Sequence, residues 1–538
     1  MRRAATFALA AILAPMLSLP ACDPKPEDRA ANELRRGNGS EPDSIDPQLA
    51  RMEAAMTILR DCYEGLVSMA PDGRPVPGVA ESWAVTEDGR RYTFRLRASA
   101  RWSNGERVVA GDFVAAWRRL VDPATASQYA LMLEPVANAA DIVAGRRSPD
   151  LLGVTAQDDA TLLVELAEPS PYFLALLSHP STFPVHRATL AANPKGFSRP
   201  GVAVTNGAFV PSAWEIGSHI LAVRNAHYWN DAATRLDAVR YVHVSDPTTE
   251  LTRFRAGDID VTYTVPPGEV ARLGKVLPGQ LHIAPTVGVY YYGFALDLPP
   301  FKDSRQLRQA LAMAVDREVL VRQVLGDGEQ PAYGWVPPGI AGYAPQAFDW
   351  ARLDAKSRIA EAQRLYRQAG YSAARPLEVE LRTSKSPLHD RIALAVAAMW
   401  KDHLGADVSL RSEDFRVLKA AIDAREAPLY RGSWIGDYND AYSFLQVMKG
   451  GFGINLPRYA SDPYDAALAT AAVAAPVERA TYLAAAERQL LTDVPVIPLY
   501  FYVSKHLVSP RVHGWYDNVM NVTYSRDLAV EGSREASR

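Results

Sequence analysis

Cysteine is scarce in this sequence, with only Cys22 and Cys62 among 538 residues. Two cysteines cannot form a disulfide framework. The stability of the protein must therefore come from a large apolar core, which a chain of this length can bury. An excess of charge of one sign is also absent, because 58 Lys and Arg stand against 61 Asp and Glu and leave a net charge of −3. Without a long basic run, nucleic acid is not an expected partner.

Catalytic and metal-binding motifs are missing as well. The sequence has no His-Glu-x-x-His helix, no Gly-x-Ser-x-Gly elbow and no P-loop, and its ten histidines are dispersed without metal-ligand spacing. Cys62 lies beside Asp61, whose negative charge raises rather than lowers the pKa of a thiol. The sequence therefore predicts that the protein is not an enzyme and uses neither a cofactor nor a metal.

Long apolar runs are confined to the N-terminus. After two arginines, Ala4 to Leu19 is almost uninterrupted small and apolar sequence, which is typical of a secretory signal and too short for a spanning helix. It ends in Leu19-Pro20-Ala21-Cys22, which resembles a bacterial lipobox, although the proline is unusual there. The resemblance implies a signal peptide over residues 1–21, a lipid on Cys22 and a polar tether over 22–31. An ordinary cleaved signal with an incidental cysteine is the alternative.

The rest of the sequence alternates between strand-like and helix-like segments without a fixed repeat, which argues against a solenoid or a propeller. Three segments favour strands, namely residues 91–97, which alternate strictly, 161–166 and 377–381. Three others favour helices, namely residues 354–370, with Asp354 as cap and Gly370 as end, 392–400, and 472–491 with a start at Pro476. The mixture predicts a multidomain α/β protein whose chain crosses between domains more than once.

Several short blocks occur in a recognisable order from about Glu33 to about Leu528. They are residues 36–47 (RGNGSEPDSIDP), 64–66, 77–83, 102–105 with 112–114, 205–209, 290–292, 300–303, 332–334 and 434–439 (WIGDYN). In order and spacing these blocks resemble the oligopeptide-binding proteins of ABC importers, which belong to family 5 of the extracytoplasmic solute-binding proteins.

This resemblance implies a three-lobed α/β fold of the periplasmic binding protein type (type II, cluster C), with two hinge crossings and a ligand cleft between domains. Domain I would comprise residues 32–53, 181–286 and 504–538, domain II residues 54–180, and domain III residues 287–503. Tyr290-Tyr291-Tyr292 and Tyr500-Phe501-Tyr502 fall close to the crossings. Taken by themselves, these aromatic clusters suit either core strands or a ring-lined cleft.

A receptor for peptides of unspecified sequence can recognise only their constant features, which are the backbone, the α-ammonium and the α-carboxylate. Strand addition and charge capture are therefore the expected mode of binding. Asp437 matches the family's amine-binding aspartate, and a carboxylate enclosed by a closed cleft needs such a cation. From spacing alone, Asp437 is a capping or loop residue.

The resemblance implies contacts along the rest of the ligand as well. The ligand backbone would pair with two segments, one formed by Glu41, Pro42 and Asp43 and the other by Ser433, Trp434 and Ile435. Trp434 could pack against a ligand side chain or belong to the core.

The ligand carboxylate would meet Arg431 and His389, although a lone histidine is more often structural. Ile422 stands where the family has a further basic residue, with Arg425 close by. Ile435 and Gly288 stand where some relatives have a disulfide, so both of its cysteines are absent.

The sequence thus predicts an extracytoplasmic lipoprotein that captures short peptides and delivers them to an ABC-type permease. Cys22 would anchor it to the outer face of the cytoplasmic membrane, in the periplasm or cell envelope. We expect a monomer, with no cofactor, metal or nucleic acid. Murein-peptide binding and peptide sensing by a lipoprotein of the same fold are the alternatives.

Overall fold

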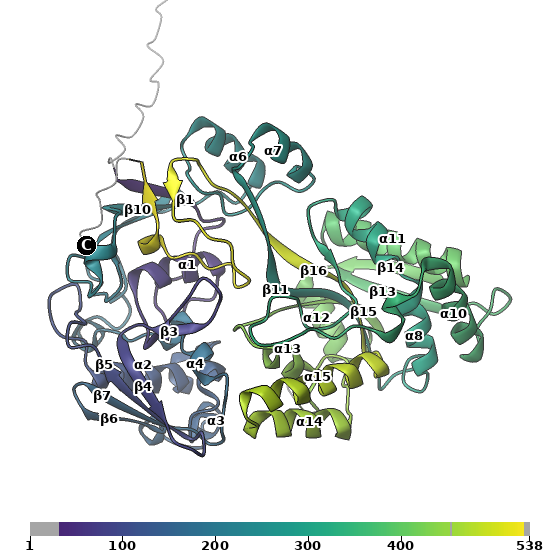
Figure 1. Ribbon diagram of the computed structural model, residues 1–538, viewed down its shortest axis with the longest axis horizontal. Helices are drawn as coiled ribbons and strands as arrows, with labels where there is room; N and C mark the ends of the chain where they lie inside the picture. Colours follow the sequence, from purple (N-terminus) through teal and green to yellow (C-terminus); the bar gives the residue numbers. More distant parts are fainter. Residues whose placement is uncertain (1–31, 452–453, 532–538) are drawn as a thin grey trace, which may run out of the picture.

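The structure is a computed structural model that describes residues 32–451 and 454–531. The predicted signal peptide, Cys22 and the tether therefore lie outside the described residues. Two bodies of mixed helix and strand lie side by side, joined by two long strands, β11 (Leu281–Phe294) and β16 (Val496–Leu507) (Figure 1). The N-terminal body also contains the last described segment of the chain, which returns through β16.

The N-terminal body contains two four-stranded sheets. One has the order β1 (Glu33–Gly37), β10 (Ala238–Val242), β9 (His219–Arg224) and β8 (Phe209–Glu215), with β1 parallel to β10. The other is antiparallel, in the order β4 (Ala80–Val85), β5 (Arg91–Leu96), β7 (Thr161–Glu165) and β6 (Val154–Asp158). Its strand β5 buries every second side chain, which confirms the alternation predicted for residues 91–97.

Helices cover these sheets through apolar faces. In α2 (Ala110–Val121), Phe113, Trp117 and Leu120 recur at helical spacing and are buried. The side chain of Asp112 accepts a hydrogen bond from the backbone N–H of Val109 and so caps the helix start. Both sheets, α2 and α1 (Glu53–Cys62) thus share one hydrophobic core.

The C-terminal body is built on a six-stranded sheet. Its order is β12 (Gln330–Pro331), β16, β11, β15 (Leu429–Ile435), β13 (Glu378–Ser384) and β14 (Asp407–Glu413). One face packs against α8 (Arg305–Ala314), α10 (Ala355–Gln368) and α11 (Pro387–Leu404), with Tyr290, Tyr292 and Tyr500 in that core. The opposite face packs against α12 (Phe415–Asp423), α14 (Asp462–Val473) and α15 (Pro476–Asp493).

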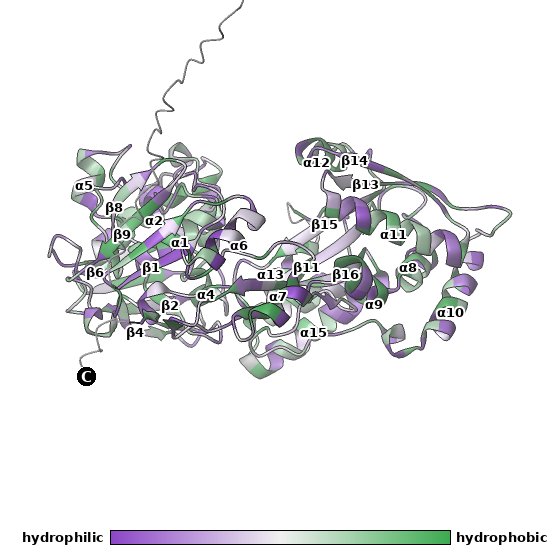
Figure 2. Ribbon diagram, turned by 90° about the horizontal axis from the view of Figure 1, so that it is seen from above, coloured by the Kyte–Doolittle hydropathy of each residue, from purple (hydrophilic) through white to green (hydrophobic). Residues whose placement is uncertain are grey.

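The two bodies are connected by an antiparallel ribbon. β11 and β16 pair from Leu281↔Leu507 to Gly293↔Val496, with irregular register between Pro285 and Val289. The ribbon begins beside α6 (Pro247–Ala256) and α7 (Val270–Val276), against a small apolar cluster, and ends inside the six-stranded sheet. Seen from above, β11 and β16 run between the two bodies (Figure 2). Within the described residues, no helix combines the length and apolar character needed to cross a membrane.

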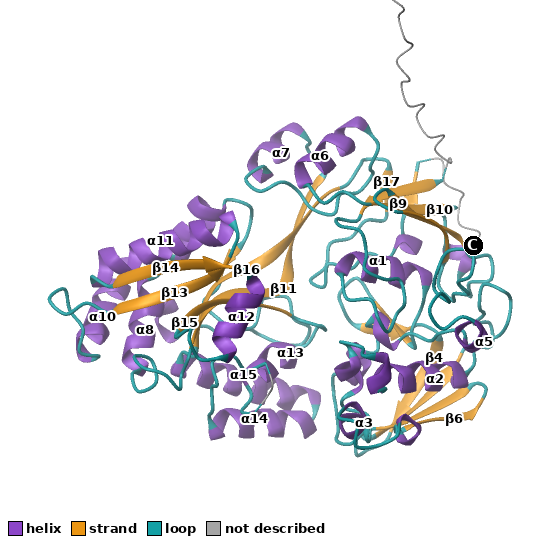
Figure 3. Ribbon diagram, turned by 180° about the vertical axis from the view of Figure 1, so that it is seen from behind, coloured by secondary structure: helices purple, strands orange, loops and turns teal. Residues whose placement is uncertain are grey.

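The secondary structure predicted from local patterns is largely confirmed, as the view from behind shows (Figure 3). Asp354 caps α10 by accepting from the N–H of Ser357 at 3.0 Å, and Gly370 follows the helix with φ of 89°. Pro476 is the first residue of α15. Cys62 is buried, and this burial raises the pKa of its thiol well above the usual value. The negative charge of Asp61 makes a smaller contribution in the same direction.

Candidate ligand-binding site

One backbone edge of β15 is open along most of the strand. The strand pairs with β11 from Leu429 to Ile435, but with β13 only at Leu429 and Tyr430. From residue 431 to 435, no other strand within the described chain pairs with this edge. Such an edge presents unpaired N–H and C=O groups to any extended chain that lies beside it.

The register identifies which backbone groups face outwards. Gly436 donates its N–H to the carbonyl oxygen of Val287 at 2.7 Å, so the adjacent pair Gly288↔Ile435 is of the non-hydrogen-bonded kind. Because the two kinds alternate along an antiparallel ladder, the N–H and C=O groups of Arg431, Ser433 and Ile435 point away from β11. These are the groups that a ligand backbone can reach.

Asp437 lies just beyond the C-terminal end of this edge. Its backbone N–H donates to Ser443 Oγ at 3.1 Å, and its side chain is exposed to solvent. Desolvation by the surrounding protein nevertheless raises the pKa of the carboxyl to about 6. No ion pair or side-chain hydrogen bond engages the carboxylate within the described part of the chain. The local capping role falls to Asp440, which accepts from the N–H of Tyr442.

A cavity of about 310 Å³ lies beside Asp437, between the two bodies. The C-terminal body contributes Trp434, Asp437, Tyr438, Gln446 and Ile454 to its lining. The N-terminal body contributes Gln128, Tyr129, Leu131, Met132, Glu134, Pro135, Tyr172 and Leu176. Most of these side chains are apolar or aromatic, so the cavity is suited to an apolar group next to a cation held by Asp437.

The loop that carries Asp437 also holds the two bodies together. The Tyr172 ring stacks between Tyr438 and Tyr442, with centroid distances of 5.2 and 4.8 Å. Beside this stack, Asn439 Nδ2 donates to the carbonyl oxygen of Asp72 at 3.2 Å. A ligand bound at Asp437 therefore lies next to a contact between the bodies.

The segment Glu41-Pro42-Asp43 lies in the N-terminal body. Glu41 accepts hydrogen bonds from Trp214 Nε1 at 2.7 Å and from the N–H of Gly217 at 3.1 Å. Pro42 is buried, and Asp43 pairs with Arg51. Burial alone would raise the pKa of the Asp43 carboxyl, but the hydrogen bonds from Arg51 have the larger combined effect. The pKa is therefore below its usual value. These side chains are thus committed within their own body.

Among the described residues, no hydrogen bond joins the segment 41–43 to Ser433, Trp434 or Ile435. Tyr129 links the two regions electrostatically: burial raises the pKa of its hydroxyl, and the charges of Asp437 and Asp43 add to this shift. The indole Nε1 of Trp434 donates to the carbonyl oxygen of Ser443 at 2.8 Å, and the ring also lines the cavity. Trp434 therefore takes part both in local packing and in the wall of the site.

Arg431 and His389 are brought together around Tyr290. The guanidinium carbon of Arg431 lies 4.8 Å from the Tyr290 ring centroid, and the His389 ring lies 5.6 Å from it. His389 Nδ1 is 3.0 Å from both the hydroxyl and the carbonyl oxygen of Ser384. Burial and the Arg431 charge lower the pKa of His389. Within the described residues Arg431 forms no ion pair with a carboxylate, so its charge is available to an anion.

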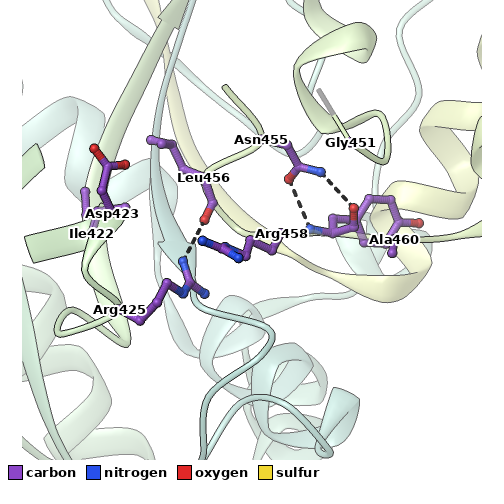
Figure 4. A pocket seen from close by; sticks show the side chains of 9 residues that line it. Ile422, Asp423, Arg425, Gly451, Asn455, Leu456, Arg458 and Ala460 are labelled. Carbon is purple, nitrogen blue, oxygen red and sulfur yellow. Dashed lines mark hydrogen bonds between the residues drawn. The ribbon is translucent and has the colours of Figure 1, made fainter. Parts of the chain in front are cut away.

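The other two positions singled out from the sequence have clear structural settings. Arg425 pairs with Asp297 and donates to the carbonyl oxygen of Leu456 at 3.2 Å. Together with Ile422 it lines a separate cavity of about 390 Å³ (Figure 4). Ile422 belongs to the core on one face of the six-stranded sheet, whereas Tyr290, which Arg431 contacts, belongs to the core on the opposite face. Arg425, beside Ile422, is therefore not part of the group formed by Arg431 and His389.

Gly288 lies directly opposite Ile435 on neighbouring strands. A Cβ at Gly288 would come within 2.6 Å of Ile435 Cδ1 and 2.8 Å of Tyr502 Cδ2. The absence of a side chain at Gly288 thus makes room for both neighbours. Directly opposite residues on neighbouring strands, such as Gly288 and Ile435, are also close enough for a disulfide when both are cysteines.

Sequence reasoning did not find the wall of the cavity that the N-terminal body provides. Tyr129, Met132, Glu134 and Tyr172 belong to short helices and loops without a recognisable motif, and only the packing of the two bodies brings them to Asp437. No local signal in the sequence marks them.

Within the described residues, the site thus combines an open strand edge, a carboxylate without an ion-pair partner and a cavity between two bodies. This arrangement is suited to binding a small solute. The chain belongs to the bacterial extracellular solute-binding proteins, family 5, whose model matches residues 74–455. This membership confirms the predicted fold class and the prediction that the protein is not an enzyme.

Its relatives include the periplasmic oligopeptide-binding protein OppA of Escherichia coli (strain K12), which is 37% identical over 97% of both chains. Among solved structures, the unliganded open form of the periplasmic murein tripeptide-binding protein MppA has a TM-score of 0.84 at 36% identity, covering 93% of this chain and 97% of that one. Haemophilus influenzae OppA in complex with RPPGFSPFR has a TM-score of 0.76 at 35% identity, covering 93% and 98%.

Proposed function

We propose that the protein binds short peptides and presents them to an ABC-type importer. In this proposal the peptide lies along the open edge of β15, with its α-ammonium at Asp437 and its carboxylate towards Arg431 and His389. Main-chain groups of Ser433 and Ile435 supply the strand pairing. The observation that carries the proposal is an unpaired strand edge that ends at a carboxylate without a cation.

The geometry of the edge suits a peptide of a few residues. Asp437 follows Arg431 by six positions, which corresponds to about 20 Å in extended chain. Arg431 and Ser433 have their side chains on the same face of the sheet as Tyr290, whereas Trp434 lies on the other. The negative charge of Asp437 and the positive charge of Arg431 therefore lie near opposite ends of the same strand edge. This arrangement complements the charged ends of a peptide zwitterion.

The finer parts of this proposal concern the cell envelope. We place the protein in the periplasm, with a signal peptide over residues 1–21 and a lipid on Cys22 that holds it at the membrane as a monomer. Relatives that cover nearly the whole chain are named as periplasmic peptide-binding proteins, which supports this location. The relative MppA is named as a murein peptide-binding protein, so a murein peptide is the second candidate ligand.

We also propose that the two bodies comprise three domains, with domains I and II in the N-terminal body and domain III in the C-terminal body. Domain I would comprise residues 32–53, 181–286 and 504–538, domain II residues 54–180, and domain III residues 287–503. The two sheets of the N-terminal body support its division, because one is built from β1 and β8–β10 and the other from β4–β7.

Isothermal titration calorimetry tests the proposal. The purified protein is titrated with Ala-Ala-Ala and with N-acetyl-Ala-Ala-Ala, and the variants Asp437→Asn and Asp402→Asn are titrated in parallel. Asp402 is an exposed aspartate of α11 and serves as the matched control. We expect the free peptide to bind, and both acetylation and Asp437→Asn to weaken binding by about 30-fold or more, because each removes one partner of a charge pair whose carboxylate the surrounding protein desolvates. Equal binding of free and acetylated peptide would refute amine capture by Asp437.

A further inference from the structure

The charges that line the cavity beside Asp437 are all of one sign. Among the described residues of its lining, only Glu134 and Asp437 carry charge, and both are acidic. Glu134 directly follows the short helix Ala130–Leu133 and is exposed. Its side chain forms no ion pair and no hydrogen bond within the described parts of the protein. Two unpaired carboxylates thus face one space, which attracts a ligand with two cationic groups.

Glu134 also stands where this cavity meets a second one. The second cavity, of about 380 Å³, shares Glu134, Pro135, Tyr172 and Gln446 with the first. Beyond these it is lined by Glu168, by Lys449 and by residues of α14. The two cavities are thus neighbours with shared walls, and Glu134 lines both of them.

The walls between the two carboxylates are apolar. Met132, Leu176 and Tyr438 form a buried cluster that spans the two bodies, and the rings of Tyr129 and Tyr172 pack against it. A lysine or arginine side chain has a hydrocarbon stem that covers apolar surface and a charged head that needs a carboxylate or water. These apolar walls suit such a stem, and Glu134 offers a carboxylate for such a head.

From this geometry we propose that Glu134 selects peptides whose first residue is basic. The inference rests on the proposed function, because it takes the α-ammonium to lie at Asp437. The first side chain then enters the cavity that Asp437 lines, and a lysine or arginine head pairs with Glu134. A glutamate as first residue would place a third negative charge beside the two that are already there, which disfavours it.

A matched set of tripeptides tests the inference by calorimetry on the purified protein. Lys-Ala-Ala is compared with norleucine-Ala-Ala, whose first side chain keeps the hydrocarbon stem but lacks the ammonium, and with Glu-Ala-Ala. We expect Lys-Ala-Ala to bind about two- to fivefold more tightly than norleucine-Ala-Ala, the range for a charge pair that water still reaches. Glu-Ala-Ala should bind most weakly of the three.

Two variants locate the effect. Glu134→Gln should bring the ratio between the affinities for Lys-Ala-Ala and norleucine-Ala-Ala to about one. Glu168→Gln is the control, because Glu168 is exposed and lines only the second cavity. A ratio that Glu134→Gln does not change, or that Glu168→Gln abolishes equally, overturns the assignment to Glu134 while peptide binding stands. If none of the three peptides binds, the proposed function itself fails.

Discussion

The affinity for peptides should fall steeply between pH 7 and pH 5, and the reason lies in Asp437. Desolvation raises the pKa of its carboxyl to about 6 in the empty protein. An α-ammonium pairs with the ionised carboxylate, so protons compete with the ligand. The ionised fraction is about 0.9 at pH 7 and about 0.09 at pH 5, and the apparent dissociation constant rises in proportion, by about tenfold. Binding is thus strongest above pH 6 and weakens as the pH falls through 6.

Calorimetry over this range gives two independent readings. The dissociation constant of Ala-Ala-Ala should follow the tenfold change, and at pH 6 binding should release about half a proton, which comparison of two buffers with different ionisation enthalpies detects. Asp437→Asn should flatten the profile. A profile that is equally steep in this variant, or flat in the original protein, would contradict the role given to Asp437.

The carboxyl of Glu250 also has a raised pKa and serves as a control. Burial raises the pKa of Glu250 to about 7, and its carboxylate accepts from the N–H groups of Tyr263 and Thr264 in the N-terminal body. Glu250→Gln should therefore retain the pH dependence of peptide affinity. His389 acts in the opposite sense, because its protonation at low pH would strengthen the attraction for a ligand carboxylate.

Three further predictions concern the strand edge and the contact between the bodies. Ser433→Pro removes the outward N–H and should weaken tripeptide binding in calorimetry, whereas Ser433→Ala should not, because the contact is made by the backbone. Gly288→Ala should lower the free energy of unfolding by about 1–3 kcal/mol in denaturant titrations, since the added methyl meets Ile435 and Tyr502; an unchanged midpoint would show that both neighbours shift freely. Tyr172→Ala removes a ring stacked between Tyr438 and Tyr442 and should speed hydrogen exchange over residues 438–445; unchanged exchange would mean that the stack does not hold the bodies together.

Local patterns predicted the elements that have a clear period or cap. Residues 91–97 alternate strictly and form β5, and Asp354 and Gly370 bound α10 as expected. β15 has no such signal, because Arg431 and Gly432 interrupt its apolar residues, and the resemblance to a family pointed to it instead.

Pairing between distant segments could not be predicted from local signals. That β15 pairs with β11 throughout but with β13 only at its start is decided by tertiary packing, and this difference creates the open edge. Likewise, Glu134 and Asp437 are far apart in sequence and line one cavity only because the two bodies meet there. The family resemblance supplied Asp437, whereas the residues facing it carry no sequence signature.

The ribbon of β11 and β16 also fixes when the protein can finish folding. β16 is an interior strand of the six-stranded sheet, and the chain that follows it packs into the N-terminal body, where Arg36 donates to the carbonyl oxygen of Thr523 at 2.8 Å. Each body therefore lacks part of its structure until the last segment of the chain has been synthesised. Joining Leu281 to Leu507 closes a long loop, and contacts so distant in sequence form slowly. A nascent chain of this design therefore stays incompletely folded until its last strand and the segment after it have emerged.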